Sequence, residues 1–381
     1  MLQPVAHAVC RPPAGLNYRA NVWLDGVLIG SQSDIVGTFR YFDFDVSSLL
    51  GSASSTPHVL AVECFRPVDA AFPPGNNSTD LAISFVDWAP PPPDMNMGLW
   101  RSVEVSTFPG PVSVRYPQVA TTLSDSVDTA HLSVTVEVEN YSNETVTGSV
   151  VVAMPGLYSG SVTMPATVEA GVSKLVTLSS TQFSELVIAQ PSLWWPWQMG
   201  EQTMHQLEVS FVLAGSSLTS DALSVAFGIR QTESELTADG YRLYKVNKQP
   251  ILIRAGGWAP DLFQRITPER QDIEFGCVWL CVWLCVWLCL CMSPVIFWCE
   301  LVCCAEPCCV RSYIRDMGLN AVRLEGKMQD DNFFATADKY GVLTIPGWCC
   351  CDAWQHWKAW KEEQHEVASA SLTSQVCSGC A

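Results

Sequence analysis

Short runs of alternating hydrophobic and polar residues follow one another along the first 230 residues of the chain. Within residues 16–115, the run Asn-Val-Trp-Leu at 21–24 precedes Asp25-Gly26, a pair typical of two-residue hairpin turns, and an apolar run at 27–30 follows. Further runs of this kind lie at 39–44 and 58–65. Short strands with period two and tight turns between them predict a β-sandwich.

A second set of alternating runs extends from about residue 117 to residue 230. Four hydrophobic residues at every second position predict one of its strands: Leu132, Val134, Val136 and Val138. Similar runs lie at 148–153, 161–167, 172–178, 206–213 and 222–228. No helical periodicity interrupts them, so we expect an immunoglobulin-like sandwich, with a linker to the first sandwich near Pro117.

The pattern changes near residue 235, where expected strands begin to alternate with expected helices. The strands are expected at 241–246, 251–255, 321–325 and 342–346. One helix is expected at 330–340, and another begins at Thr267-Pro268, which offers an N-cap followed by proline in the first helical position. This alternation predicts a parallel sheet, with about three strand–helix units before residue 381.

A stretch without charged residues, 276–299, interrupts this alternation and contains three perfect copies of Cys-Val-Trp-Leu at 277–288. Three interpretations of residues 277–312 stay open. One is a translated intron or gene-model error, which the perfect repeat favours because a short G/T-rich DNA unit can encode it. Another is a membrane span, for which the stretch is long enough. The last is a metal or redox cluster, although Cys303-Cys304 and Cys308-Cys309 lack CxxC spacing.

The residues on either side of 277–312 favour the first interpretation. When that segment is removed, four apolar side chains fall on one helical stripe: Ile273, Tyr313, Ile314 and Met317. Gly318 then follows as a plausible C-cap. We therefore expect a single helix that the segment splits.

Composition narrows the function classes. The chain has 21 Lys and Arg against 38 Asp and Glu residues, a formal net charge of −17, which argues against a nucleic-acid partner. Ten of the 17 cysteines lie between Cys277 and Cys309, which argues against a disulfide framework across the chain. The N-terminus has neither the basic region nor the apolar stretch of a signal peptide.

Five short motifs stand in order along the three regions: Val-Trp-Leu-Asp-Gly at 22–26, Asn-Met-Gly-Leu-Trp-Arg at 96–101, Pro-Ser-Leu-Trp-Trp-Pro at 191–196, Phe-Gly-Ile-Arg at 227–230 and Leu-Tyr-Lys-Val-Asn at 243–247. In content and order they resemble glycoside hydrolase family 2. The resemblance implies a multidomain β plus α/β protein with three parts. These are an N-terminally truncated sugar-binding jelly-roll at 1–115, an immunoglobulin-like β-sandwich at 116–232, and the incomplete first part of a (β/α)8 TIM barrel at 233–381, interrupted by 277–312.

Three further motifs are more discriminating: Trp-Ala-Pro-Asp-Leu-Phe at 258–263, Val-Arg-Leu-Glu-Gly at 322–326, and Pro-Gly-Trp-Cys-Cys-Cys-Asp-Ala-Trp at 346–354. Together they look like the exo-β-D-glucosaminidase branch of the family, which removes glucosamine from the non-reducing end of chitosan oligomers. The three adjacent cysteines at 349–351 cannot readily chelate one metal ion. We expect no metal and no cofactor.

Asp261 follows one expected barrel strand and Glu325 ends the next, at the end of the barrel where active sites assemble. Two carboxylates there could bind the ammonium group of a glucosamine unit, a role that the resemblance also implies. Alternatively, Asp261 caps its turn and Glu325 pairs with a neighbouring arginine. Trp348 and Trp354 are candidates for the walls of the sugar site, although core packing is nearly as plausible for Trp348.

Hydrolysis with retention needs two carboxyl groups about 5 Å apart, one an acid/base and the other a nucleophile. The resemblance implies that both glutamates come from later barrel strands, beyond residue 381. We therefore expect the polypeptide as written to be inactive. Two alternatives stay open: a non-catalytic carbohydrate-binding protein made of two β-sandwiches, and a β-mannosidase-type exo-glycosidase.

The expected partner is an oligosaccharide, with neither a nucleic acid nor a membrane involved. The resemblance implies an extracellular, secreted protein, although the chain shows no signal peptide. Four sequons, at Asn76, Asn77, Asn140 and Asn143, fit secretion, but a Ser/Thr-rich chain also produces sequons by chance.

Overall fold

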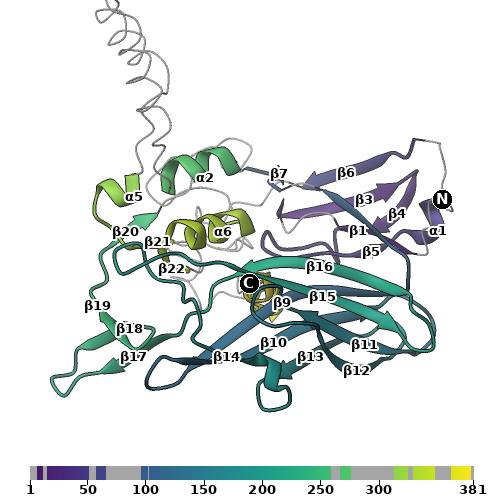
Figure 1. Cartoon of the computed structure of the whole chain (residues 1–381). Coiled ribbons are helices and arrows are strands. Elements are labelled where there is room, and N and C mark those ends of the chain that lie inside the picture. Colours follow the sequence, from purple (N-terminus) through teal and green to yellow (C-terminus); the bar gives the residue numbers. More distant parts are fainter. Residues whose placement is uncertain are drawn as a thin grey trace, which may run out of the picture.

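The computed structural model describes residues 7–11, 15–50, 57–65, 96–101, 103–258, 267–275, 313–324, 329–347 and 362–378. Figure 1 shows a small β-region next to a larger β-sandwich, with a compact group of strands and helices at one end of both. Strands are more common than helices in the described chain, and every described strand pair up to residue 251 is antiparallel. No helix among the described residues has the length and apolar character that a membrane crossing requires.

The first β-region consists of short antiparallel strands. They are β1 (His7–Arg11), β2 (Leu16–Asn17), β3 (Arg19–Leu24), β4 (Val27–Gly30), β5 (Phe44–Asp45), β6 (Leu60–Phe65), β7 (Gly98–Leu99) and β8 (Glu104–Phe108), with the one-turn helix α1 (Ser47–Leu50). They pair in the orders β5-β1-β8, β4-β3-β6 and β2-β7. The predicted hairpin at Asp25-Gly26 is confirmed, because both residues have positive φ angles, 50° and 82°, as a type I′ turn requires.

The strand predicted at 39–44 is wrong, since only Phe44 lies in a strand. Phe39 and Phe42 are both buried, and a spacing of three residues cannot place two side chains on the same face of a strand. Phe39 packs into the core of the α/β unit, whereas Phe42 packs into the first β-region. This loop therefore joins two cores, and its aromatic residues are shared between them.

Two four-stranded sheets form the sandwich. Its elements are β9 (Val112–Leu123), β10 (Thr129–Asn140), β11 (Val146–Ala153), β12 (Val162–Val168), β13 (Ser173–Ser179), η1 (Ser184–Leu186), β14 (Val187–Ala189), β15 (His205–Leu213) and β16 (Thr219–Phe227). One sheet has the order β13-β10-β14 with β9 also paired to β10, and the other has the order β12-β11-β15-β16. The four alternating residues predicted in the second region, from Leu132 to Val138, are all fully buried in β10.

The linker predicted near Pro117 is wrong, because Pro117 lies inside the twelve-residue strand β9. The ladder pairs Arg115 with Glu137 and Gln118 with Thr135, and its register shifts between these pairs. Tyr116 has a φ of 47° at this bulge. A bulge removes two residues from regular pairing, so proline, which has no N–H to donate, is tolerated there.

The last part of the described chain combines a three-stranded antiparallel sheet, β17-β18-β19, with a parallel sheet. The elements are β17 (Thr232–Leu236), β18 (Arg242–Val246), β19 (Gln249–Ile251), β20 (Ala255–Trp258), α2 (Pro268–Phe275), α5 (Tyr313–Asp316), β21 (Ala321–Leu324), α6 (Asp331–Tyr340), β22 (Leu343–Ile345) and α7 (Glu362–Ser378). Strands β20, β21 and β22 pair in parallel in that order, which confirms the predicted parallel sheet. The strand predicted at 251–255 is wrong, because β19 ends at Ile251 and β20 begins at Ala255.

The helix predicted around residues 277–312 is described only at its two ends. Thr267 caps α2 by accepting a hydrogen bond from the Arg270 N–H at 3.3 Å, as predicted. Gly318 ends α5 with a φ of 69°, and the Leu319 N–H reaches back to the Ile314 carbonyl. Residues 277–312 themselves lie outside the described residues.

The single apolar stripe predicted for that helix is wrong. Phe275 and Ile314 are buried in one core, but Tyr313 is 60% exposed and Met317 is 64% exposed. The short helix α5 therefore buries Ile314, half-buries Arg315 against Trp197 and Tyr340, and exposes Tyr313 and Asp316.

Two of the four sequons lie among the described residues, and they differ in accessibility. Asn140 is fully buried; its Nδ2 donates to the carbonyls of Glu144, Val168 and Glu169, while its Oδ1 accepts from Ser142. Asn143 is exposed. In the folded protein only Asn143 of this pair can accept a glycan.

Replacing Asn140 with alanine should destabilise the sandwich by about 2 kcal/mol, because the amide satisfies buried backbone carbonyls that lose their donor. The shift of the unfolding midpoint in urea measures this effect. Asn143→Ala, three residues away in the same turn, is the control and should change stability by less than about 0.5 kcal/mol. Equal shifts for the two variants would contradict the structural role of Asn140.

Candidate functional site

The three parallel strands point their carboxyl ends toward the same edge of the sheet. Trp258 at the end of β20 pairs with Leu324 at the end of β21, and Arg323 pairs with Ile345 at the end of β22. In the sequence, Glu325 directly follows β21, and both Asp261 and Trp348 come three residues after their strands. In the sequence, three of the four predicted site residues therefore follow strands that end at the same edge of the sheet.

All four predicted site residues, Asp261, Glu325, Trp348 and Trp354, lie outside the described residues. Their proximity to one another and their roles stay predictions. The described residues contain no group of three or more His, Cys, Asp or Glu side chains that could hold a metal ion. Cys349, Cys350 and Cys351 also lie outside the described residues.

Aromatic side chains pack below this edge. Trp258, Phe275 and Phe333 form a mutual cluster, with ring centroids 5.4 Å, 5.2 Å and 4.9 Å apart. Phe275 and Phe333 are fully buried, and Leu324 lies in the same core. The strand ends that precede Asp261 and Glu325 are therefore held by a close-packed core, the kind of support that positions a site precisely enough for recognition.

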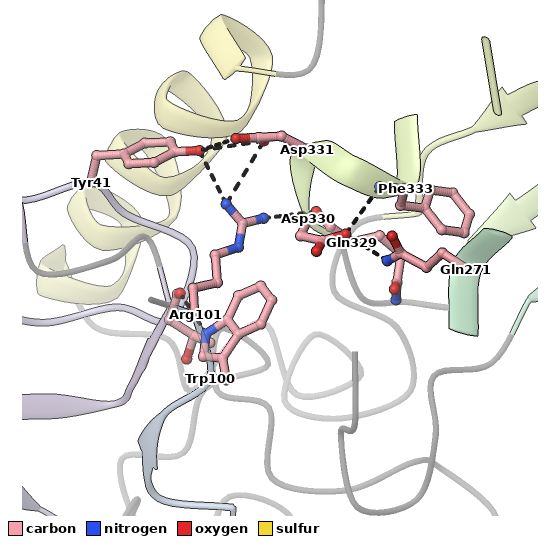
Figure 2. Close-up of polar contacts among 9 residues, drawn as sticks. Tyr41, Trp100, Arg101, Gln271, Gln329, Asp330, Asp331 and Phe333 are labelled. Atoms are coloured by element: carbon pink, nitrogen blue, oxygen red, sulfur yellow. Dashed lines mark hydrogen bonds and ion pairs between the residues drawn. The ribbon is translucent and has the colours of Figure 1, made fainter. Parts of the chain in front are cut away.

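The first β-region contacts the α/β unit through Arg101, the last residue of a motif that carries the family resemblance (Figure 2). The guanidinium donates from Nη1 to the Tyr41 hydroxyl at 3.1 Å and from Nη2 to the Gln329 carbonyl at 2.9 Å. The Arg101 side chain is only 12% exposed, and its guanidinium carbon lies 4.6 Å from the Trp100 ring centroid. This contact fixes Gln329, the described residue that follows the connection 325–328.

The N-terminus of α6 is held from the same side. Asp330 caps the helix by accepting from the Phe333 N–H at 3.1 Å, and the Gln271 side chain of α2 donates to the same carboxylate oxygen at 2.6 Å. Asp331 accepts a hydrogen bond from the Tyr41 hydroxyl at 3.2 Å and lies 3.8 Å from Arg101 (Figure 2).

Two opposing effects act on the Asp331 carboxyl. Desolvation against the first β-region raises its pKa, although the side chain remains 60% exposed, while the Arg101 charge and the Tyr41 hydrogen bond act in the opposite direction. The nearby charges of Asp330 and Glu104 add to the desolvation, so the pKa of Asp331 lies above the usual aspartate value despite the Arg101 contact.

The sandwich contacts the C-terminal end of helix α6. Arg230 binds both oxygens of Asp338 at 2.6 Å and 3.2 Å, and its guanidinium carbon lies 4.4 Å from the Trp194 ring centroid. The Trp194 indole donates to the Asp338 carbonyl at 2.7 Å. The motifs at 191–196 and 227–230 thus supply contacts between the sandwich and α6. Sequence reasoning missed this role, although paired Trp and Arg residues are the usual anchors of such contacts.

Arg230→Ala should lower the free energy of unfolding by about 2 kcal/mol, because it leaves Asp338, whose side chain is only 14% exposed, without its ion-pair partner. Thermal unfolding of the 381-residue chain measures the effect. Arg242→Ala is the matched control, since Arg242 is exposed and, within the described residues, donates to Ser234 on the neighbouring strand. A control variant as destabilised as Arg230→Ala would refute the importance of this interface.

Comparison with known proteins shows which family and relatives the chain is similar to. Residues 112–230, which contain the sandwich, match the family model of glycosyl hydrolases family 2. The exo-β-D-glucosaminidase of Streptomyces avermitilis is 31% identical over 376 residues, covering 95% of this chain and 35% of the relative. The exo-β-D-glucosaminidase of Amycolatopsis orientalis is 30% identical over 370 residues, covering 95% of this chain and 30% of the relative.

The solved structures agree with the sequence relatives. The crystal structure of the exo-chitosanase CsxA of Amycolatopsis orientalis superposes with a TM-score of 0.75 at 28% identity, covering 98% of this chain and 38% of that one. The chain therefore spans about a third of the length of the relatives that it matches. It carries a domain of glycosyl hydrolase family 2 and is homologous along nearly its whole length to exo-β-D-glucosaminidases.

Proposed function

We propose that this protein is a retaining exo-glycosidase that releases β-linked glucosamine from chitosan oligosaccharides. The observation that carries the proposal is the homology to exo-β-D-glucosaminidases over 95% of the chain, which includes the strand ends at Trp258, Leu324 and Ile345. A related structure contains CsxA bound to a glucosamine glycoside, with 28% identity to this chain. The β-mannosidase-type specificity is the alternative that the experiments below distinguish.

The sheet β20-β21-β22 is, in this proposal, the first part of a (β/α)8 TIM barrel within 233–381, with 277–312 as an insert. The different burial of the two faces of this sheet supports the barrel proposal. Val322 and Leu324 on one face pack against the helices, whereas Gly257 and Ile345 on the opposite face are exposed. Closure of a barrel would place that exposed face inside. The jelly-roll at 1–115 and the immunoglobulin-like sandwich at 116–232 complete the proposed architecture.

Recognition of the amino sugar rests, in this proposal, on Asp261 and Glu325. Both are carboxylates that follow parallel strands at one edge of the sheet, and two carboxylates offer charge-assisted hydrogen bonds to one ammonium group. Trp348 and Trp354 supply apolar surface for the sugar ring. The net charge of −17 would attract a polycationic chitosan chain toward the protein.

Cleavage itself requires an acid/base glutamate and a nucleophilic glutamate about 5 Å apart. By the family resemblance both follow residue 381, and none of the described residues is assigned either role. We also propose an extracellular location, with which the exposed Asn143 sequon is consistent.

Chitosan oligosaccharides should bind to the 381-residue polypeptide, and Asp261→Asn and Glu325→Gln should each weaken binding at this site about tenfold, because each substitution removes one charge-assisted contact. Competition of a fluorescent glucosamine oligomer by unlabelled oligomers measures the affinity. Asp239→Asn, in the exposed turn between β17 and β18, is a charge-matched control. Tighter binding of mannose oligomers would favour the β-mannosidase-type alternative.

A polypeptide of residues 1–381 should bind such oligomers without hydrolysing them. The measurement is the release of glucosamine from a glucosamine tetramer, detected by mass spectrometry against a sample without protein. Release above that blank would show that the two catalytic carboxylates lie within residues 1–381. It would leave the proposed substrate class intact but overturn the expected inactivity.

A further inference from the structure

The turn between β10 and β11, residues 141–145, carries two sequons that follow each other directly. They are Asn-Tyr-Ser at 140–142 and Asn-Glu-Thr at 143–145. An Asn-x-Ser/Thr sequence is the acceptor pattern for an N-linked glycan. Neither sequon contains a residue of the strand-end site or of the contacts between the sandwich and α6, so this turn is a separate feature of the molecule.

The Asn140 amide forms part of the sandwich interior. The residue is fully buried, and its Nδ2 lies 2.7, 3.0 and 3.2 Å from the carbonyl oxygens of Glu144, Val168 and Glu169. An amide nitrogen has two hydrogens, and a glycan replaces one of them. A sugar on Asn140 would also need the space that these carbonyls occupy. The sandwich therefore cannot form around a glycan at Asn140.

Asn143 lies on the outside of the same turn, where residues 143–145 are all exposed. Other residues hold the turn in place. The Asn140 Oδ1 accepts from the Ser142 N–H at 2.9 Å. The Tyr141 N–H donates to the Pro111 carbonyl, which precedes β9, at 2.9 Å. Neither of these contacts uses the Asn143 side chain, so a glycan on Asn143 leaves them intact.

Burial distinguishes two sequons that the motif alone treats as equal. A bulky, solubilising glycan has to lie in solvent. Asn143 meets this condition in the folded chain, whereas Asn140 does not. A polypeptide modified at Asn140 before folding could not complete the sandwich, so folding excludes such molecules from the folded protein.

We propose that Asn143 is an N-glycosylation site in the exported protein and that Asn140 stays unmodified. The donor class is a lipid-diphosphate-linked oligosaccharide. The Asn143 amide nitrogen bonds to C1 of the first sugar and loses one proton, while the C1–O bond to the phosphate breaks and the lipid diphosphate leaves. The assignment rests on the proposed extracellular location and not on the proposed glycosidase activity.

The experiment exports the 381-residue chain from a glycosylating eukaryotic host behind a cleavable signal peptide. An N-glycosidase in heavy-oxygen water converts each glycosylated asparagine to a labelled aspartate, which peptide mass spectrometry assigns to position 140 or 143. We expect the label at Asn143 in most molecules and none at Asn140. Protein that is retained inside the host cells is mapped in the same way in its soluble, protease-resistant fraction.

Two single substitutions form the matched pair. Thr145→Ala removes the hydroxyl of the second sequon and keeps Asn143, so it should abolish the glycan at Asn143, and Thr145→Ser should restore it. Ser142→Ala removes the first sequon and should leave the glycan at Asn143 unchanged.

An unmodified Asn143, or a glycan at Asn140 in the folded protein, would overturn the assignment. A glycan that is lost in Ser142→Ala but kept in Thr145→Ala would also overturn it, because Asn140 would then be the acceptor. The signal peptide makes these outcomes independent of the natural location, so a chain that stays inside its natural cells would overturn only the proposed location. Loss of chitosan-oligomer binding would count against the proposed activity alone.

Discussion

The α/β unit depends on hydrogen bonds that the sandwich donates to backbone carbonyls at its helix ends. The last carbonyls of a helix have no partner within that helix, so a buried helix end needs donors from elsewhere. Trp194 supplies one to Asp338 at the end of α6, and Trp197 supplies one to Leu319 after α5. Gln198 adds a third, to Gly318. Three consecutive or nearly consecutive residues of one sandwich loop therefore satisfy both helix ends.

The close approach of the sandwich loop to α6 also explains why residue 341 is a glycine. Gly341 ends α6 in the left-handed conformation with a φ of 71°, and its carbonyl accepts from the Trp197 N–H at 3.0 Å. A Cβ at this position would lie 2.6 Å from the Trp197 nitrogen, so any other residue would force the loop away from the helix. Conformation and contact both require glycine here.

The sandwich and the first β-region contact opposite ends of helix α6. In a strand–helix unit the carboxyl end of the strand and the amino end of the following helix lie on the same side, and the helix carboxyl end lies on the other. The sandwich holds the carboxyl end of α6 through Arg230 and Trp194, while Arg101 of the first β-region binds Gln329 at its amino end. Among the described contacts, that of Arg101 in the first β-region lies on the side from which Asp261 and Glu325 continue in the sequence.

The regular part of this architecture could be predicted from the sequence, and the parts that depend on long-range contacts could not. Period-two alternation predicted β10 because each inward side chain, such as Val134, needs only a buried face. Pro117 was misread because the bulge that accommodates it depends on the partner strand β10. Phe39 was misread because it packs into a core more than two hundred residues away in the sequence. The four predicted site residues lie outside the described residues, and their roles follow from local pattern and family resemblance.

The core that contains Phe39 also contains side chains from both sides of residues 277–312. Phe275 before them and Ile314 after them are both buried in the cluster that contains Val322 of β21 and Phe333 of α6. The described core thus contains side chains from both sides of 277–312, and the two helices that bracket this segment contact each other. Since β20 and β21 also pair directly, their register does not need the intervening residues as a spacer. Helices α2 and α5 and strands β20 and β21 therefore form one packed unit, although 37 residues separate α2 from α5 in the sequence.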